Sequence, residues 1–185
     1  MNKVRLQKKF DNNNYSPGGS AIKRFVWYFT SALFFRTGLI PSSNLLVMIL
    51  RLFGAKIGKD VRIKPFINIK YPWKFTVGDH TWIGENCIID NLDDVKLGEN
   101  VCLSQYSMLL TGNHNYKKTS FDLITSPIII EDGVWIGAKT VVCPGVIAFS
   151  HSILTVGSII AKNMEPYSIY TGNPAIKVRD RNILD

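Results

Sequence analysis

Aliphatic residues recur at every sixth position along much of this chain. A period of six fits neither the 3.6-residue turn of an α-helix nor the two-residue alternation of an ordinary β-strand. It is typical of hexapeptide repeats, in which short parallel strands joined by tight corners stack into a β-helix. The pattern therefore predicts an all-β fold, a parallel β-helix with these aliphatics pointing inward. The positions are Val77, Ile83, Ile89, Leu97, Leu103, Leu109, Ile130, Ile136, Val142, Ala148, Leu154 and Ile160.

Two other features repeat in the same phase. Glycine directly follows the aliphatic residue in several repeats, and we expect it there because a tight corner requires backbone angles that other residues resist. A small or modest side chain stands four residues after the aliphatic. These second positions are Thr81, Cys87, Val101, Ser107, Val134, Thr140, Val146, Ser152 and Ser158. One coil cannot bury its own face, so we expect the stacking of neighbouring coils to supply the stability.

The repeat also predicts how the chain is organised. We expect the β-helix over residues 57–162 and a C-terminal tail over residues 163–185. The longest interruption separates Leu109 from Ile130, which lie 21 residues apart where three repeats of six take 18. The residues that fall off register form an extended loop over 111–127. A loop held by a rigid scaffold is a favoured place for functional groups.

The segment ahead of the repeats has a different pattern. Residues 1–20 predict a flexible basic arm, and residues 21–56 predict an apolar, basic segment with two short helices. Ser43 or Asn44 is expected to cap the second helix. The apolar stretches are too short to span a bilayer. The helices either pack against the β-helix or a neighbouring subunit, or they lie in a membrane interface.

Charge divides the chain at the same place. The formal net charge is +8. Residues 1–56 carry nine Lys or Arg against the single acid Asp11, whereas the remainder carries 13 residues of each sign. A basic and apolar segment favours an anionic surface, and a membrane leaflet is the natural candidate. We expect no nucleic-acid partner.

Composition narrows the setting. The 185 residues suffice for one domain, and 46% hydrophobic against 19% charged residues indicates a folded protein. Three cysteines without CxxC spacing favour a reducing compartment. The polar first 20 residues do not resemble a signal peptide. We therefore expect a cytoplasmic protein, with peripheral contact at the inner face of the membrane as the sharper alternative.

Three histidines are the candidates for acid–base chemistry. His80 and His151 fall at outer corners of their repeats, where a solvated side chain is the default expectation. His114 instead lies in the sequence TGNHNY, where the chain leaves the repeats, and Asn113 and Tyr116 beside it are candidates to bind the acceptor or orient the histidine. A neutral imidazole near pH 7 is well suited to act as a general base. A structural polar loop is the alternative.

The ordered motifs resemble a known family. The hexapeptide repeats, the TGNHNY loop, VWIG at 134–137 and GNPA at 172–175 are together similar to the left-handed β-helix acyltransferases. Over roughly residues 22–180 the chain most resembles the colanic-acid biosynthesis acetyltransferases. The stretches that carry this closer resemblance are AKIGKDVRIKP, KYPWKFTVGDHTWIG, IDNLDDVKLG, FDLITSPIIIEDGVWIGA and YTGNPA.

The resemblance implies a left-handed parallel β-helix that forms a homotrimer of triangular prisms, with active sites between subunits. Acetyl-CoA would lie along the groove between two prisms. His114 matches the catalytic histidine, which takes the proton of an acceptor hydroxyl while that oxygen attacks the acetyl thioester. A backbone N–H of a facing coil would hold the oxyanion. No metal is implied, and no role falls to the cysteines.

Further site residues follow from the same resemblance. Asp90 and Asn91 would flank the acceptor pocket and orient a sugar hydroxyl or the histidine, or they would simply shape a turn. Asp122 or Glu131 would orient the histidine. The positions that match the acetyl-CoA path are Trp135, Ala138, Val156, Ala161, Lys162, Lys177 and Arg179. The alternative for Trp135 is that it packs at a subunit interface. The alternative for Lys177 and Arg179 is that they belong to a solvated tail.

Two departures from the family pattern fall on the expected donor groove. Phe149 stands where a small corner residue is usual, and Val156 belongs to a Thr-Val-Gly-Ser stretch that replaces a small pair. Either change would narrow the groove, shift the donor or weaken the enzyme.

The implied function is O-acetylation of a sugar hydroxyl in an exopolysaccharide, capsule or lipid-linked saccharide precursor. A small soluble acceptor, such as an amino sugar or an antibiotic, is the alternative within the same chemistry. Zinc enzymes that resemble the γ carbonic anhydrases share the solenoid, but they need two histidines close in sequence, which this chain lacks. A non-catalytic scaffold is the remaining alternative.

Overall fold

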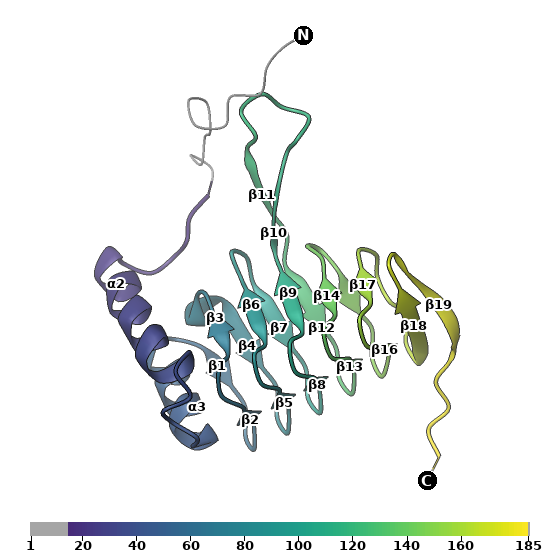
Figure 1. Cartoon of the computed structure of the whole chain (residues 1–185), viewed down its shortest axis with the longest axis horizontal. Coiled ribbons are helices and arrows are strands. Elements are labelled where there is room, and N and C mark those ends of the chain that lie inside the picture. The colour runs from purple at the N-terminus through teal and green to yellow at the C-terminus, as the bar shows by residue number, and fades with distance from the viewer. Residues whose placement is uncertain (1–14, 185) are drawn as a thin grey trace.

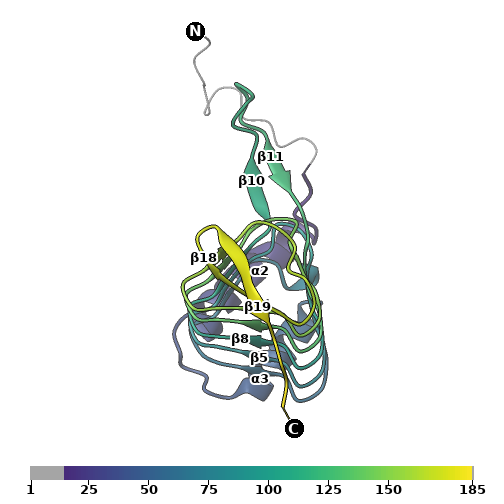
Figure 2. The same cartoon turned by 90° about the vertical axis from the view of Figure 1, so that its right-hand side faces the viewer.

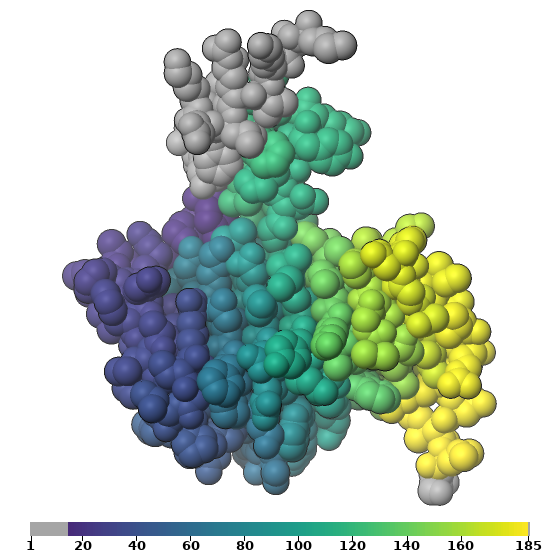
Figure 3. All heavy atoms as spheres, in the orientation of Figure 1, coloured from purple at the N-terminus to yellow at the C-terminus, as the bar shows by residue number. Residues whose placement is uncertain are grey.

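Three parallel sheets wind around one core and form the sides of a prism (Figure 1). The computed structural model describes residues 15–184, so residues 1–14 of the expected arm and Asp185 of the expected tail lie outside the described residues. Helices cover one end of the prism, and a hairpin projects from its body (Figure 3). The predicted parallel β-helix is confirmed.

Successive strands of the coil pass from one sheet to the next. Sheet A contains β1 (Lys56–Ile57), β4 (Phe75–Val77), β7 (Val95–Leu97), β12 (Ile128–Ile130) and β15 (Ile147–Ala148). Sheet B contains β2 (Arg62–Ile63), β5 (Trp82–Ile83), β8 (Cys102–Leu103), β13 (Trp135–Ile136), β16 (Ile153–Leu154), β18 (Ser168–Gly172) and β19 (Ala175–Asp180). Sheet C contains β3 (Asn68–Ile69), β6 (Ile88–Asp90), β9 (Met108–Leu110), β14 (Val141–Val142) and β17 (Ile159–Ile160).

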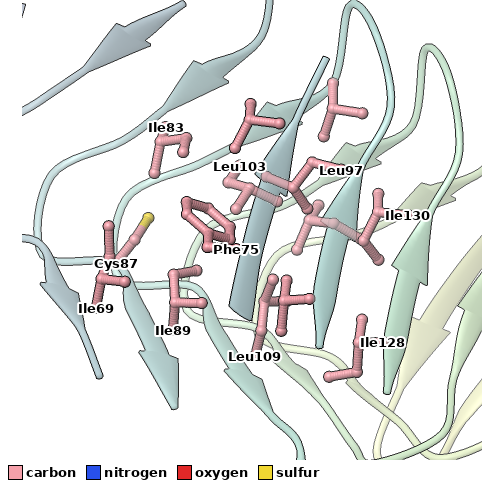
Figure 4. Packing of buried hydrophobic residues seen from close by; sticks show 14 of the residues in the cluster. Ile69, Phe75, Ile83, Cys87, Ile89, Leu97, Leu103, Leu109, Ile128 and Ile130 are labelled. Atoms are coloured by element: carbon pink, nitrogen blue, oxygen red, sulfur yellow. The ribbon is translucent and has the colours of Figure 1, made fainter. Parts of the chain in front are cut away.

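The six-residue period places the aliphatic column in the core, as predicted. Ile83, Leu103 and Ile136 lie in register on neighbouring strands of sheet B, and all three are buried. The second positions are buried as well, including Thr81, whose hydroxyl donates to the Gly98 carbonyl at 2.9 Å. Figure 4 shows side chains from successive coils converging on the interior. Each buried aliphatic contributes roughly 1.5–3 kcal/mol, so the column makes a rigid scaffold.

The corner glycines serve a different purpose from the one we expected. Neither Gly84 nor Gly137 has a positive φ. Instead, the next coil passes so closely that a Cβ at Gly84 would lie 2.6 Å from the backbone nitrogen of Gln105. A Cβ at Gly137 would lie 2.6 Å from the carbonyl oxygen of Leu154. These positions require glycine because coils stack tightly there, whereas left-handed backbone falls on other corner residues.

Two short helices cover the N-terminal end of the prism. α2 (Ala21–Thr30) continues into a π-helical turn, η1 (Ser31–Phe35), and α3 (Ser43–Leu52) closes the first coil with buried Leu46 and Leu50. No helix within residues 15–184 is both long and apolar enough to cross a membrane.

The start of α3 differs from our expectation. The N-cap position is Ser42, and its side chain makes no capping hydrogen bond. Ser43 lies in the first turn, where its hydroxyl accepts from the N–H of Ile63 at 2.7 Å and donates to the Val61 carbonyl at 3.3 Å. The Ser43 hydroxyl therefore ties the helix to the solenoid, because a neighbouring coil offers it better partners than the helix end does.

The chain just before α2 contacts the solenoid. The Tyr15 hydroxyl donates to the Leu92 carbonyl at 3.2 Å, and the Trp73 indole donates to the Pro17 carbonyl at 2.8 Å. Trp73 lies in a short 3-10 turn, η2 (Pro72–Lys74). Within the described part of the expected arm, these bonds hold the backbone against the prism.

The chain after the repeats forms structure of its own. β18 adds a parallel strand to sheet B, and β19 folds back on β18 in antiparallel register. Met164 and Tyr170 are buried at this end of the core. Most of the segment expected as a tail therefore closes the C-terminal end of the prism.

The long interruption of the repeat forms a β-hairpin. β10 (Gly112–His114) and β11 (Leu123–Thr125) pair in antiparallel register, with His114 opposite Leu123. The hairpin joins β9 of sheet C to β12 of sheet A, so it rises from the edge where these two sheets meet. Sheet B forms the side of the prism opposite that edge (Figure 2).

Candidate active site

His114 lies on the hairpin, held by backbone and ring contacts. Its Nδ1 lies 3.0 Å from the carbonyl oxygen of Phe121, and the two rings stack with centroids 4.4 Å apart at 11°. A carbonyl oxygen only accepts hydrogen bonds, so Nδ1 carries the proton. The lone pair of the neutral ring then resides on Nε2, which makes Nε2 the basic nitrogen.

Neighbouring residues set the backbone around the histidine. The Asn113 side chain accepts a hydrogen bond from the His114 N–H at 2.8 Å, and the Tyr116 N–H donates to the His114 carbonyl at 3.0 Å. Phe121 has a left-handed backbone, with φ of 51°, that turns its carbonyl toward the ring. The partner of Nδ1 is thus a main-chain group, which side-chain patterns cannot reveal.

The two acids expected near the histidine have other hydrogen-bond partners. The Asp122 carboxylate accepts from Lys118 at 3.0 Å, and hydrogen bonds from Ser120 and then Lys118 lower its pKa. Glu131 follows β12 at the corner toward sheet B, where its carboxylate accepts from both the N–H and the hydroxyl of Ser150, at 2.9 and 2.8 Å. These contacts give Glu131 a role in shaping that corner.

A groove of about 400 Å³ lies on the outer face of sheet B, and we call it the sheet-B groove. Its lining residues are Ser104, Gln105, Trp135, Gly137, Ala138, Ile153, Leu154, Thr155 and Val156. The Trp135 indole donates to the Ser104 hydroxyl at 2.9 Å, which fixes the ring on the groove wall. Val156 is 70% exposed at the rim, whereas Phe149 is not among the lining residues.

The sheet-B groove collects three of the seven residues expected on the acetyl-CoA path. Ala161 and Lys162 are exposed where the chain leaves β17 of sheet C. Lys177 lies on β19, and its ammonium lies 2.8 Å from the carboxylates of both Asp180 and Glu165. The hydrogen bonds that it donates to Asp180 and then to Glu165 raise its pKa. These cations and Ala161 do not line the groove of the single chain, and neither does the exposed Arg179.

A second cavity, of about 490 Å³, lies between α2 and the outer face of sheet C, and we call it the α2 hollow. Four charged residues line it, namely Arg24, Arg36, Lys70 and Asp90. Asp90 pairs with Lys70 at 2.9 Å. Sequence patterns pointed only to Asp90, because the other wall belongs to a helix outside the repeats.

Asn91, next to Asp90, is fully buried and turned away from the hollow. Its side chain accepts from the Tyr71 N–H at 2.9 Å and donates to the Tyr71 carbonyl at 2.7 Å. This pair of hydrogen bonds replaces the backbone partner that a neighbouring strand would provide, at a point where the coil is interrupted. The amide is therefore occupied by backbone, in the manner of a residue that shapes a turn.

The other two histidines lie at corners of the coil. His80 is exposed and lies 3.5 Å from the Asp60 carboxylate. His151 differs from the solvated side chain we expected, since it is half-buried and stacks on Tyr167 with centroids 4.8 Å apart. The chain that follows the repeats covers it. Within residues 15–184, no group of three His, Cys, Asp or Glu side chains is placed to hold a metal ion.

His114 and the sheet-B groove lie on opposite sides of one prism. The hairpin rises from the edge between sheets A and C, and sheet B is the side facing away from that edge (Figure 2). The α2 hollow, in contrast, shares sheet C with the base of the hairpin, because Met108 and Leu110 of β9 line it. In one chain, the hairpin that carries His114 therefore continues from a strand that lines the α2 hollow, whereas the sheet-B groove lies on another side of the prism.

Comparison with known proteins identifies the family. No protein-family model matches the chain. The sequence is 35% identical over 164 residues to the colanic acid biosynthesis acetyltransferase WcaF of Escherichia coli K12, and the match covers 89% of this chain and 90% of WcaF.

Two solved structures share the fold. A hexapeptide-repeat acetyltransferase from Vibrio cholerae O1 biovar eltor, solved with acetyl coenzyme A, superposes with a TM-score of 0.81 at 21% identity, covering 96% of this chain and 98% of that one. A maltose O-acetyltransferase from Clostridium difficile 630 superposes with a TM-score of 0.79 at 22% identity, covering 91% and 92%. The match to WcaF confirms the resemblance in the motifs, and the chain belongs to the hexapeptide-repeat acetyltransferase family that contains WcaF.

Proposed function

We propose that this protein transfers the acetyl group of acetyl-CoA to a sugar hydroxyl, with His114 as the general base. The observation that carries the proposal is the contact between His114 Nδ1 and the Phe121 carbonyl, which leaves Nε2 basic. Nε2 takes the hydroxyl proton as the sugar oxygen bonds to the thioester carbon. The carbon–sulfur bond then breaks, and the proton passes from Nε2 to the departing sulfur of CoA.

The sheet-B groove is the proposed donor site. Among residues 15–184 no charged residue lines it, and Trp135, Ala138 and Val156 give it an apolar wall. Such a surface suits the long, neutral pantetheine arm of acetyl-CoA. Backbone N–H groups of the coil that faces the base would stabilise the oxyanion, since each donor of this kind contributes about 10²–10³ in rate.

The proposed active unit is a homotrimer. His114 and the groove point away from each other in one chain, so a complete site needs the hairpin of one copy beside sheet B of the next (Figure 2). A closed ring of three copies repeats this heterologous contact at every interface. The positions of the proposed base and donor groove therefore support a closed ring of copies, and we propose that the ring contains three.

The proposed acceptor is a sugar in an exopolysaccharide or capsule precursor, including one linked to a lipid. WcaF is named for colanic acid biosynthesis, and the clostridial structure is named as a maltose O-acetyltransferase. These names support a saccharide hydroxyl as the acceptor. The α2 hollow is the proposed acceptor side of the site, since it shares sheet C with the base of the hairpin.

We also propose peripheral contact with the inner face of an anionic membrane. Five large apolar residues of α2 and η1 form an exposed stripe at helical spacing: Ile22, Phe25, Val26, Phe29 and Leu33. Residues 15–56 contain five Lys or Arg and no carboxylate. Replacing Phe25 and Phe29 with Ser should abolish sedimentation with phosphatidylglycerol vesicles, whereas Val178→Ser on the opposite end should not. Binding that survives loss of both rings would reject this part of the proposal.

Complementation between two defective chains tests the shared site. His114→Ala removes the base, and Ala138→Trp fills the sheet-B groove. Each variant alone should be inactive. His114→Ala should still bind acetyl-CoA, whereas Ala138→Trp should not bind it. Refolding an equal mixture should restore about a quarter of the wild-type rate, because a quarter of the interfaces then combine an intact histidine with an intact groove. Absence of any recovery in mixed oligomers would place the site within one chain.

A further inference from the structure

The α2 helix presents two chemically different faces. Arg24, Trp27, Tyr28 and Ser31 recur at spacings of three and four and line the α2 hollow. Trp27 anchors this face, since its indole donates to the Ile69 carbonyl at 3.1 Å. One wall of the hollow is therefore a helix held in place. The ligand that the hollow can bind depends on which charges and hydrogen-bonding groups of its lining have no partner.

Two guanidinium groups in the hollow keep an uncompensated charge. Arg24 donates to the Gly19 carbonyl at 2.8 Å, and Arg36 donates to the Asn68 side-chain oxygen at 2.9 Å. Both acceptors are neutral, and neither guanidinium has an ion pair within the described part of the chain. Because the Asp90 charge is matched by Lys70, the lining carries a net charge of +2.

Ser31 supplies an independent sign of a ligand. It is only 2% exposed, it lines the hollow, and its hydroxyl has no hydrogen-bond partner among the described residues. A buried hydroxyl without a partner costs about 1–3 kcal/mol, so a structure rarely keeps one without a reason. Ser31 also begins the π-helical turn η1, and such turns occur frequently at functional sites.

The remaining wall suits a saccharide ring. Tyr28 and Tyr71 line the hollow together with Met108 and Leu110 of sheet C. Tyr71 is held in place by stacking on Trp73, with centroids 5.2 Å apart. Aromatic and aliphatic surfaces of this kind pack against the apolar face of a ring, while hydroxyl groups around them accept and donate hydrogen bonds.

We infer that the α2 hollow binds a saccharide that carries an anionic group, either a phosphate ester or a carboxylate. Arg24 and Arg36 hold the anion, the Ser31 hydroxyl donates to it, and the sugar ring packs between Tyr28 and Tyr71. Guanidinium groups suit both anions, because their planar forks match two oxygens at once. The view that this ligand is the acetyl acceptor rests on the proposed function, whereas the binding itself does not.

Calorimetry on the full chain tests the inference with three probes of one ring: galactose 1-phosphate, galacturonate and galactose. We expect at least one anionic probe to bind more tightly than galactose. The double variant Arg24→Gln, Arg36→Gln should weaken that probe at least tenfold, the effect of losing a charge-assisted hydrogen bond. The matched control is Arg62→Gln, an exposed arginine on sheet B, which should bind as wild type does. Preference for the phosphate or for the carboxylate identifies the anion.

Ser31→Ala is the second variant, because it removes a group with no partner and should fold at least as stably as wild type. We expect it to bind the anionic probe several-fold more weakly without a drop in thermal stability. Equal binding of galactose, no binding of any probe, or unchanged binding by both variants would overturn the inference. Acetyl-CoA binding is measured in the same samples. If it persists while the anionic probes fail, the inference is wrong and the proposed function stands.

Discussion

The sheet-B groove and the α2 hollow are similar in size and opposite in chemistry. Their volumes are about 400 and 490 Å³. Within the part of the chain that the structure describes, no charged side chain lines the groove, whereas four line the hollow. The groove consists of coil residues alone, including Gly137 and Ala138. The hollow exists only because α2, from outside the repeats, lies over sheet C.

The difference shows which kind of binding surface the repeats form by themselves and which kind requires a segment outside the repeats. The repeat keeps small residues at such corners, because a Cβ at Gly137 would lie only 2.6 Å from the Leu154 carbonyl oxygen of the neighbouring coil. A small-residue corner makes a smooth groove that suits a neutral chain of atoms. The two cations of the hollow that have no carboxylate partner among the described residues come from the added segment, Arg24 on α2 and Arg36 at the end of η1, which is free of the stacking constraint. We therefore expect donor binding to depend on the solenoid and acceptor binding on the added helix.

Removing His114 should have the largest effect, since it is the proposed general base and it lines neither cavity. We expect His114→Ala to lower kcat by about 10²–10⁴, the usual contribution of a general base. Acetyl-CoA binding at the groove and anion binding at the hollow should both persist in calorimetry. His80→Ala is the matched control, because His80 is exposed and paired with Asp60. A variant that keeps most of its rate would show that another group is the base.

Truncating Trp135 should affect one cavity alone. We expect Trp135→Ala to weaken acetyl-CoA binding about tenfold, because it removes an aromatic wall of the groove. The affinity of the α2 hollow for its anionic probe should not change. Trp82→Ala provides the control, since Trp82 and Trp135 both pair with Cys102 on sheet B and Trp82 does not line the groove. Equal losses in the two variants would show that the donor extends along the whole sheet.

The smallest effect should come from Val156, the departure from the family pattern at the groove rim. Val156→Ala widens the groove without removing a hydrogen bond, so we expect acetyl-CoA to bind about twofold more tightly in calorimetry. Val178→Ala, on exposed β19, is the comparison and should leave binding unchanged. Weaker binding by Val156→Ala would mean that the valine contacts the donor and does not obstruct it.

The fold was predictable to a degree that the site was not. The burial of residues such as Ile83 and Leu103 could be predicted, because in a six-residue repeat the same position of every strand points into the core. His114 was a candidate because it lies where the chain leaves the repeats, and its catalytic role stays a prediction. Its orienting partner was not, since that partner is the carbonyl of Phe121 and every residue has a carbonyl.

The α2 hollow lay almost wholly beyond sequence patterns. Ser31 reads as one small residue in an apolar helix, and only its 2% exposure together with its unpartnered hydroxyl marks it. Lys177 illustrates the opposite case, since its charge suggested a phosphate partner and the structure places it between Glu165 and Asp180. Glu165 lies 12 residues before Lys177, so the two charges meet only because the chain folds back between them.

The sequence by itself determined the parallel coil, the position of its long interruption, the histidine on that interruption and the family. Those features depend on the periodicity and the order of residues, which can be read directly from the sequence. Only the tertiary structure decided that His114 and the sheet-B groove face opposite ways and that α2 encloses a charged hollow over sheet C. These spatial relations involve residues from different coils. They depend on the number of residues in each turn of the coil and on the apolar surface against which the helix packs.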